Sequence, residues 1–164
     1  MDFNLIDLGL IDFKEAWLQQ KTIFEQVKNR VLESALIVCK HYQVITLGRQ
    51  AKKENLKFSE EEIKKKGIAV YEIERGGDVT YHGPGQLTVY PIFNLSYFKK
   101  DIHWYLRLLE GIIIDLLSDF GIKGIRHAGL TGVWVGKKKI GSIGIAIKNW
   151  ITFHGLSINI KKTT

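Results

Sequence analysis

Two long stretches with helical spacing of apolar residues, set among many short β-rich segments, most constrain how this chain can fold. Asp12 and Glu15 form a capping pair that opens the first pattern, which runs to about Leu32. Asp101 opens the second, which continues through Trp104, Leu108, Ile112, Leu116 and Phe120 to a stop at Gly121. The β-rich segments lie at 3–8, 35–39, 44–48, 68–73, 86–95, 122–126, 132–136, 139–147 and 154–160. Helices and strands that are grouped rather than alternating predict an α+β fold, with a mixed β-sheet packed with two long helices.

Two local signals refine this prediction. Ser59 and Glu62 form a capping box and Gly67 supplies a stop, which predicts a short polar helix over 60–66. Pro91 interrupts the apolar segment 86–95. Because proline cannot donate a backbone hydrogen bond, its part of the strand is expected at a sheet edge or a bulge.

The length of 164 residues and a hydrophobic content of 45% predict one domain, 1–164, with a single core. No apolar run reaches the length of a membrane span, and the N-terminal MDFNLIDLG lacks a basic region followed by an apolar one, so neither a membrane segment nor a signal peptide is expected. The single cysteine, Cys39, excludes an internal disulfide and indicates a reducing, cytoplasmic location.

The net charge of +7 favours an acidic partner, which could be a nucleic acid or a protein. The lysines are spread in short clusters that suit solvated turns and helix faces, so charge alone does not choose between partners. The five histidines are far apart, without a helical His-x-x-x-His pair. A zinc site is therefore not expected.

The stretch 75–86, Arg-Gly-Gly-Asp-Val-Thr-Tyr-His-Gly-Pro-Gly-Gln, carries the strongest functional signal. Its glycines let a ligand approach the backbone, and its polar side chains can orient a substrate. A phosphate loop would need a helix directly after the glycines, whereas Gln-Leu-Thr-Val-Tyr-Pro-Ile follows here and is extended. A substrate-binding loop is the better interpretation, with a plain hairpin as the alternative.

Residues 75–86 resemble the signature of the lipoyl(octanoyl) transferase family, and the likeness continues along the chain. The further blocks that resemble this family, in order and at suitable spacing, are Thr46–Arg49, Leu130–Val135, Lys139–Gly144 and His154–Asn159. The resemblance implies a fold like that of the biotin and lipoyl protein ligases. It also implies an acyltransferase that works in two steps.

In the implied reaction, a cysteine thiolate takes octanoyl from acyl carrier protein as a thioester. A lysine of a lipoyl domain, in a 2-oxoacid dehydrogenase or in the glycine cleavage H protein, then attacks the thioester to give an amide. Dividing the transfer replaces one difficult step by two easier ones. The resemblance implies no ATP, metal or other cofactor, and no nucleic acid or membrane as partner.

The resemblance also implies which residues form the site. Lys139 matches the family lysine that lowers the pKa of the cysteine, and a nearby ammonium does favour a thiolate. The positions that match the acyl-binding pocket are Arg75, Gly76, Gly77, Asp78, Val79, Thr80, Tyr81, His82, Ser142, Ile143, Gly144, Gly155, Leu156 and Ser157.

The nucleophile is the main departure from the family. The family cysteine follows the last block in a Pro-Cys-Gly setting, and this sequence ends at Thr164 before reaching such a position. Cys39 lies in a β-rich segment, where a thiol behaves as a small buried hydrophobe. We therefore expect a C-terminally truncated transferase, or a chain that has lost catalysis.

Two other functions stay open. An ATP-dependent lipoate or biotin protein ligase would share the fold, although such ligases show Gly-Gly-Gly and His-Asp where this loop has Gly-Gly-Asp and His-Gly-Pro-Gly. A non-catalytic module that binds the carrier protein would explain the missing cysteine.

Overall fold

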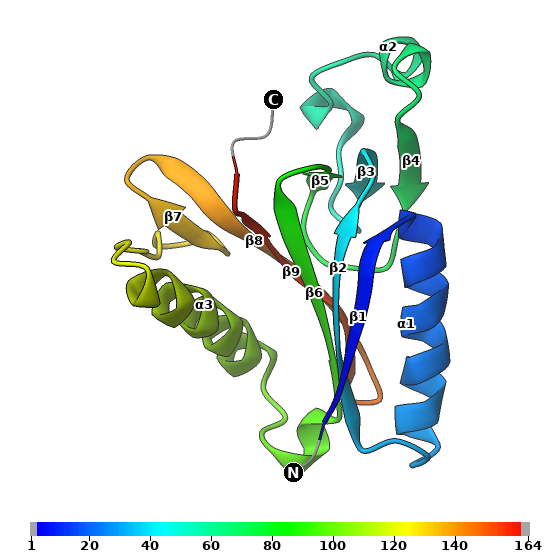
Figure 1. Cartoon of the computed structure of the whole chain (residues 1–164), viewed down its shortest axis with the longest axis vertical. Helices are drawn as coiled ribbons and strands as arrows, with labels where there is room; N and C mark the ends of the chain where they lie inside the picture. The colour runs from blue at the N-terminus through cyan, green and yellow to red at the C-terminus, as the bar shows by residue number, and fades with distance from the viewer. Residues whose placement is uncertain (1–2, 162–164) are drawn as a thin grey trace.

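The computed structural model describes residues 3–161 and contains two β-sheets (Figure 1). The larger sheet has the order β1-β2-β6-β9-β8-β7, with β1 parallel to β2 and the other neighbours antiparallel. The smaller sheet has the order β4-β3-β5 and is also mixed. The strands are β1 Asn4–Ile11, β2 Ser34–His41, β3 Val44–Leu47, β4 Ala69–Glu72, β5 Val79–His82, β6 Gln86–Phe93, β7 Val133–Val135, β8 Lys138–Lys148 and β9 Ile151–Asn159.

The two long helices, α1 (Phe13–Lys28) and α3 (Ile102–Asp119), cover opposite faces of the larger sheet (Figure 1). α1 packs on alternate residues of β2, among them Ala35 and Ile37. α3 packs mainly over β7 and β8. The short helix α2 (Glu60–Lys65) and two 3-10 turns, Lys53–Asn55 and Leu95–Tyr97, complete the elements. The predicted α+β fold with a mixed sheet and two long helices is confirmed.

The helix starts also follow the sequence. The Asp12 and Asp101 side chains accept from backbone N–H groups at the starts of α1 and α3, and Ser59 with Glu62 forms the predicted capping box. The stop of α1 was predicted too late. The helix ends at Lys28 because Arg30 adopts a left-handed conformation, with φ of 60°. Glycine is the usual residue in this conformation, and since arginine occupies the position, no sequence signal marked the stop.

The predicted strand at 122–126 is wrong, since this segment makes only an isolated bridge between Ile125 and Trp134. In α3, the buried positions include Tyr105, Leu109, Ile113 and Leu117. Each of them follows directly after one residue of the apolar stripe Trp104, Leu108, Ile112 and Leu116, from which the sequence predicted the helix. Of this stripe, Leu108, Ile112 and Leu116 are exposed. Together with apolar residues of β2 and β6, the stripe lines an apolar groove between α3 and the sheet.

Pro91 does not lie at an edge, because β6 is flanked by β2 and β9. The backbone ladder between β6 and β9 runs from Gln86 to Val89 and resumes only as a bridge between Asn94 and Ile151. Within this gap the Thr152 hydroxyl donates to the Pro91 carbonyl oxygen at 2.8 Å and accepts from the Phe93 N–H at 3.0 Å. The Thr152 side chain thus pairs the Pro91 carbonyl and the Phe93 N–H in the stretch where the backbone ladder is interrupted and proline has no N–H to contribute.

Replacing Thr152 with valine is expected to lower the free energy of unfolding by about 1–3 kcal/mol, since a fully buried residue loses its hydroxyl and leaves the Phe93 N–H unpaired. Urea denaturation checks this. Thr22→Val is the matched control, because the Thr22 hydroxyl donates to Leu18 on the exposed side of α1. Equal losses in the two variants would contradict the bridging role.

Among the described residues, no helix is long and apolar enough to cross a membrane.

Candidate functional site

A pocket lined by both polar and apolar side chains forms where the glycine-rich segment, β6, β8 and β9 meet α1. Nine of the fourteen residues predicted to bind the acyl group line it, although they come from three separate segments of the chain. These nine are Arg75, Thr80, His82, Ser142, Ile143, Gly144, Gly155, Leu156 and Ser157. The pocket has a cavity volume of about 30 Å³, which is room for very few water molecules.

Arg75 forms one wall of the pocket and is 6% exposed. Its guanidinium donates to the Thr46 carbonyl oxygen at 2.7 Å, the Thr46 hydroxyl at 2.9 Å and the Gly76 carbonyl oxygen at 3.0 Å. Gly48 and Gly144 leave room for it, since a Cβ at Gly144 would stand 2.8 Å from the Arg75 Cδ. Burial lowers the pKa of Arg75 to about 10, so it stays charged at neutral pH. The pocket therefore has a fixed positive charge.

His82 is buried at the end of β5 and lies parallel to the Phe13 ring, 6.3 Å between centroids. The Gln86 amide nitrogen donates to the Tyr81 carbonyl oxygen, which turns the amide oxygen toward His82 Nδ1 at 3.1 Å. Nδ1 must then carry the proton, and Nε2 keeps its lone pair. Burial, with the nearby His41, lowers the pKa of His82 to about 3. The imidazole is neutral at physiological pH.

A second buried cluster lies behind the pocket. His41 Nδ1 donates to the Ile11 carbonyl oxygen at 3.1 Å, and its Nε2 accepts from the Tyr90 hydroxyl at 2.7 Å. Cys39 Sγ lies 3.4 Å from the same Nε2. Although this resembles a Cys-His pair, the cysteine is 1% exposed and burial raises its pKa to about 12. Such a thiol is a poor nucleophile, as its β-rich surroundings predicted.

His154 reaches the pocket from β9 with a left-handed φ of 55°. Its backbone N–H donates to the buried Gln20 side chain at 2.8 Å, and its Nε2 lies 3.3 Å from a Glu74 carboxylate oxygen. Burial lowers the pKa of His154, so we treat the contact as a hydrogen bond from a neutral imidazole. The hydrogen bond from His154 lowers the pKa of Glu74 to about 2.

The remaining predicted acyl-pocket residues lie near the pocket without lining it: Gly76, Gly77, Asp78, Val79 and Tyr81. Asp78 accepts from the Lys52 N–H and the Asn55 side chain, so its carboxylate ties the segment after β3 to the glycine-rich turn. The Gly77 carbonyl oxygen accepts from the Gln50 N–H at 3.1 Å. These residues shape the turn that carries Arg75.

Lys139 lies apart from this pocket. It is paired with Trp134 across β7 and β8, and its Nζ stands 5.1 Å from the centre of the Trp134 ring. It lines a neighbouring depression together with Asn159 and Lys161. Burial lowers the pKa of Lys139, and the charge of Glu110 opposes that shift.

The pocket also has lining residues that sequence reasoning did not assign to the site: Phe13, Ile73, Thr88, Tyr90 and His154. One usable signal was present. Gln86, Thr88 and Tyr90 alternate along a predicted strand, so they share one face of it. The sequence pattern gave no comparable signal for Phe13, which lies at the start of α1. In the part of the chain that the structure describes, no three His, Cys, Asp or Glu side chains are grouped to hold a metal.

The model of the lipoyl protein ligase A/B catalytic domain matches residues 12–163. The chain belongs to this family. It is 46% identical over 164 residues to a chloroplastic octanoyltransferase of Arabidopsis thaliana, covering 96% of this chain and 57% of the relative. It is 41% identical over 157 residues to an octanoyltransferase of Gloeobacter violaceus, covering 95% and 68%. The chain thus spans less than two thirds of the first relative's length.

Among solved structures, the chain resembles a bipartite lipoate protein ligase from Thermoplasma acidophilum, described with its E2 lipoyl domain. The TM-score is 0.72 at 19% identity, with 100% of this chain and 63% of that one covered. The resemblance confirms the ligase-like fold expected from the sequence.

Proposed function

We propose that these residues form the substrate-binding part of an octanoyltransferase that accepts octanoyl from acyl carrier protein and passes it to a lysine of a lipoyl domain. The observation that carries the proposal is the pocket, in which segments 75–82, 142–144 and 155–157 meet. Relatives named octanoyltransferase at 41–46% identity favour transfer over ATP-dependent ligation. We place the activity in a reducing compartment, either a bacterial cytoplasm or an organelle such as the chloroplast of the Arabidopsis relative.

In the proposed reaction, the acyl chain enters beside Ile143 and Leu156, while polar groups of Arg75 and Ser157 face the carbonyl end. The cavity of about 30 Å³ is too narrow for eight carbons, so binding requires the lining side chains to move apart. The Arg75 guanidinium donates to the backbone oxygens of Gly76 and Thr46, which keeps its charge in place during such a movement.

Lys139 would hold a nearby cysteine as thiolate and manage its proton, since an ammonium stabilises the anion. The position supports this role, because Ile160 and Lys161 line the same depression and a cysteine soon after them would come within reach. The assignment of the acyl-pocket residues and of Lys139 is part of the same proposal. The predicted interruption of the chain at Thr164 falls outside the described residues.

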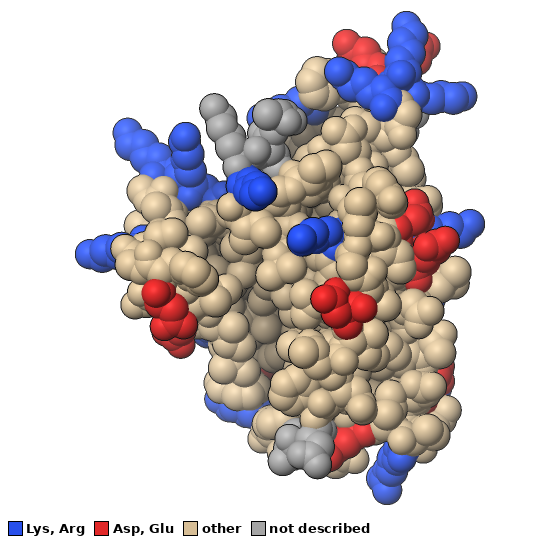
Figure 2. Space-filling model, viewed as in Figure 1, with Lys and Arg blue, Asp and Glu red and all other residues tan. Residues whose placement is uncertain are grey.

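Charge supports an acidic protein surface as partner. Figure 2 shows lysine and arginine side chains at the end of the molecule that carries α2 and the turn between β7 and β8, with acidic side chains beside those of α2. Lys64, Lys65, Lys137 and Lys138 belong to these two places. Such a surface speeds encounter with an acidic carrier domain at low salt.

The proposal is tested by extending the chain with a Pro-Cys-Gly block and assaying octanoyl transfer to a lipoyl domain. Transfer is expected from octanoyl-carrier protein without ATP, and a Lys139→Met variant of the extended chain should lose most of it. Attachment only from free octanoate with ATP would instead identify a ligase. Tight binding of the carrier domain without any transfer by the extended chain would identify a binding module.

The 164-residue chain alone is expected to form no octanoyl adduct, because Cys39 is its single cysteine and is buried with a raised pKa. Intact-mass measurement after incubation with octanoyl-carrier protein checks this. Iodoacetamide supplies the control, since it should modify Cys39 rapidly only after the chain is unfolded in urea. An adduct that maps to Cys39 would contradict the expectation.

A further inference from the structure

A buried carboxylate on α3 lies behind Lys139 and has no role in the reaction described so far. Glu110 is 0% exposed, and among the buried residues of the described chain it is the one carboxylate. A lone buried carboxylate is costly unless it is paired and fully hydrogen-bonded. Its partners therefore indicate what it stabilises.

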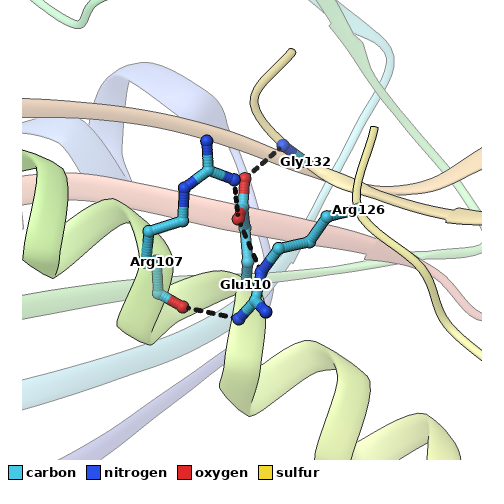
Figure 3. Close-up of polar contacts among 4 residues, drawn as sticks. All are labelled: Arg107, Glu110, Arg126 and Gly132. Atoms are coloured by element: carbon cyan, nitrogen blue, oxygen red, sulfur yellow. Dashed lines mark hydrogen bonds and ion pairs between the residues drawn. The ribbon is translucent and has the colours of Figure 1, made fainter. Parts of the chain in front are cut away.

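Figure 3 shows Glu110 held from three directions. One oxygen, Oε2, accepts from Arg107 at 2.6 Å and from Arg126 Nε at 3.0 Å. The other, Oε1, accepts from the Gly132 backbone N–H at 3.0 Å. Arg126 also donates to the Arg107 carbonyl oxygen at 3.0 Å, which fixes the network to α3. The carboxylate thereby ties α3 to the segment that leads into β7.

The Lys139 side chain packs directly against the backbone of Gly132. A Cβ at Gly132 would overlap the Lys139 Cε and stand 3.1 Å from its Nζ, and the glycine has a left-handed φ of 134°. The same amide whose N–H is held by Glu110 therefore borders the lysine. A shift of this backbone would move the ammonium or uncover it.

We infer that Glu110 is a positioning residue for Lys139: it holds the Gly132 backbone against the lysine side chain and places an acidic charge beside the ammonium. The role of Lys139 itself rests on the proposed function. Burial lowers the pKa of Lys139 and the charge of Glu110 raises it, which agrees with a carboxylate that keeps the lysine protonated.

The other groups near Lys139 do not supply this charge. Trp134 on β7 offers its ring face, and Asn159 on β9 donates to the Lys139 carbonyl oxygen at 3.4 Å. Lys138 on β8 and Lys161 after β9 line the same depression and are cationic. Arg107 and Arg126, which bind Glu110, are cationic as well, so each of them opposes the effect of Glu110 on the ammonium.

The test measures how fast acetic anhydride modifies Lys139 in the folded 164-residue chain, across pH, by mass spectrometry of peptides. Exposed Lys14 on α1 serves as internal reference. Glu110→Gln keeps an oxygen for the Gly132 N–H but removes the charge, so a larger fraction of Lys139 is unprotonated. We expect its rate at neutral pH to rise about twofold or more relative to Lys14, with the pH profile moved to lower pH.

Arg107→Met is the matched variant, because it removes a cation from Glu110 and leaves the carboxylate. Lys139 should then react more slowly than in the wild-type chain, the opposite direction. An unchanged pH profile in Glu110→Gln, or an equal acceleration in both variants, would overturn the inference in favour of a purely structural network.

If Glu110→Gln does not fold, Arg107→Met decides alone, since the Arg107 side chain is half exposed and its loss is tolerable. A rate no slower than wild type would then overturn the inference. None of these measurements uses an octanoyl substrate. If the modification rates contradict the inference about Glu110, the proposed octanoyl transfer is not affected. If the transfer assay fails, the effect of Glu110 on the Lys139 ammonium can still be confirmed by the modification rates.

Discussion

Replacing Gly155 with alanine is expected to lower the free energy of unfolding by about 3 kcal/mol. Gly155 lies on β9 opposite β6, where a Cβ would overlap the Val89 carbonyl oxygen and stand 2.6 Å from the Pro91 Cδ. Both obstacles belong to a central strand that cannot retreat without disturbing β2. The methyl group must therefore force β6 and β9 apart at the pocket. Urea denaturation followed by circular dichroism measures the loss.

Gly76→Ala provides the matched control for this prediction. Gly76 belongs to the same pocket region, but a Cβ there would meet only the Ile145 carbonyl oxygen at an ordinary 3.7 Å. We expect a change in unfolding free energy within about 1 kcal/mol. If Gly155→Ala and Gly76→Ala lower the free energy of unfolding equally, the close approach of β6 and β9 is not what requires glycine at position 155.

Acidification from pH 7 to pH 5 is expected to destabilise the protein by about 2 kcal/mol through His82 alone. In the unfolded chain His82 titrates near its ordinary pKa of 6.5, and burial lowers the pKa in the folded state to about 3. Below pH 6.5, His82 therefore binds a proton in the unfolded state but stays neutral in the folded state. The stability that His82 contributes is thus complete above pH 6.5 and is lost progressively as the pH falls toward 3.

His82→Gln should flatten this part of the pH profile, because glutamine cannot take up the proton. The measurement is the unfolding free energy at several pH values for both chains, compared as slopes so that a constant offset in the variant does not matter. His103→Gln, an exposed change on α3, should keep the wild-type slope. The burial-based explanation fails if the His82→Gln slope equals that of the wild type.

The fold could be predicted wherever local chemistry decided the structure. Capping residues at Asp12, Ser59 and Asp101 marked where helices begin, and these starts are confirmed. Strand order could not be predicted, because it depends on pairing between distant segments. Pro91 shows why: this proline lies in a central strand, and the neighbouring backbone groups are paired by the hydroxyl of Thr152, sixty-one residues away.

The site was predictable in part. The glycine-rich segment and the two later blocks were recognised from their residues, and the structure brings nine of their members to one pocket. Phe13 could not be assigned, since an aromatic residue opening an amphipathic helix has the pattern of an ordinary core residue. Glu110 was not predicted for a related reason. A glutamate within a helix is a common surface residue, and its burial and its bonds to Arg126 and Gly132 depend on segments far along the chain.

The order of strands has a consequence for how the chain acquires its structure during synthesis. β9, the last strand along the described chain, lies between β6 and β8 in the larger sheet. Until it emerges from the ribosome, the two halves β1-β2-β6 and β8-β7 have no strand to join them. The pocket, which needs residues 155–157, consequently cannot form before β9 has been made. Sequence-distant pairing of this kind is slow, so the half-built sheet stays exposed to misassociation for longer than a helical domain of this length.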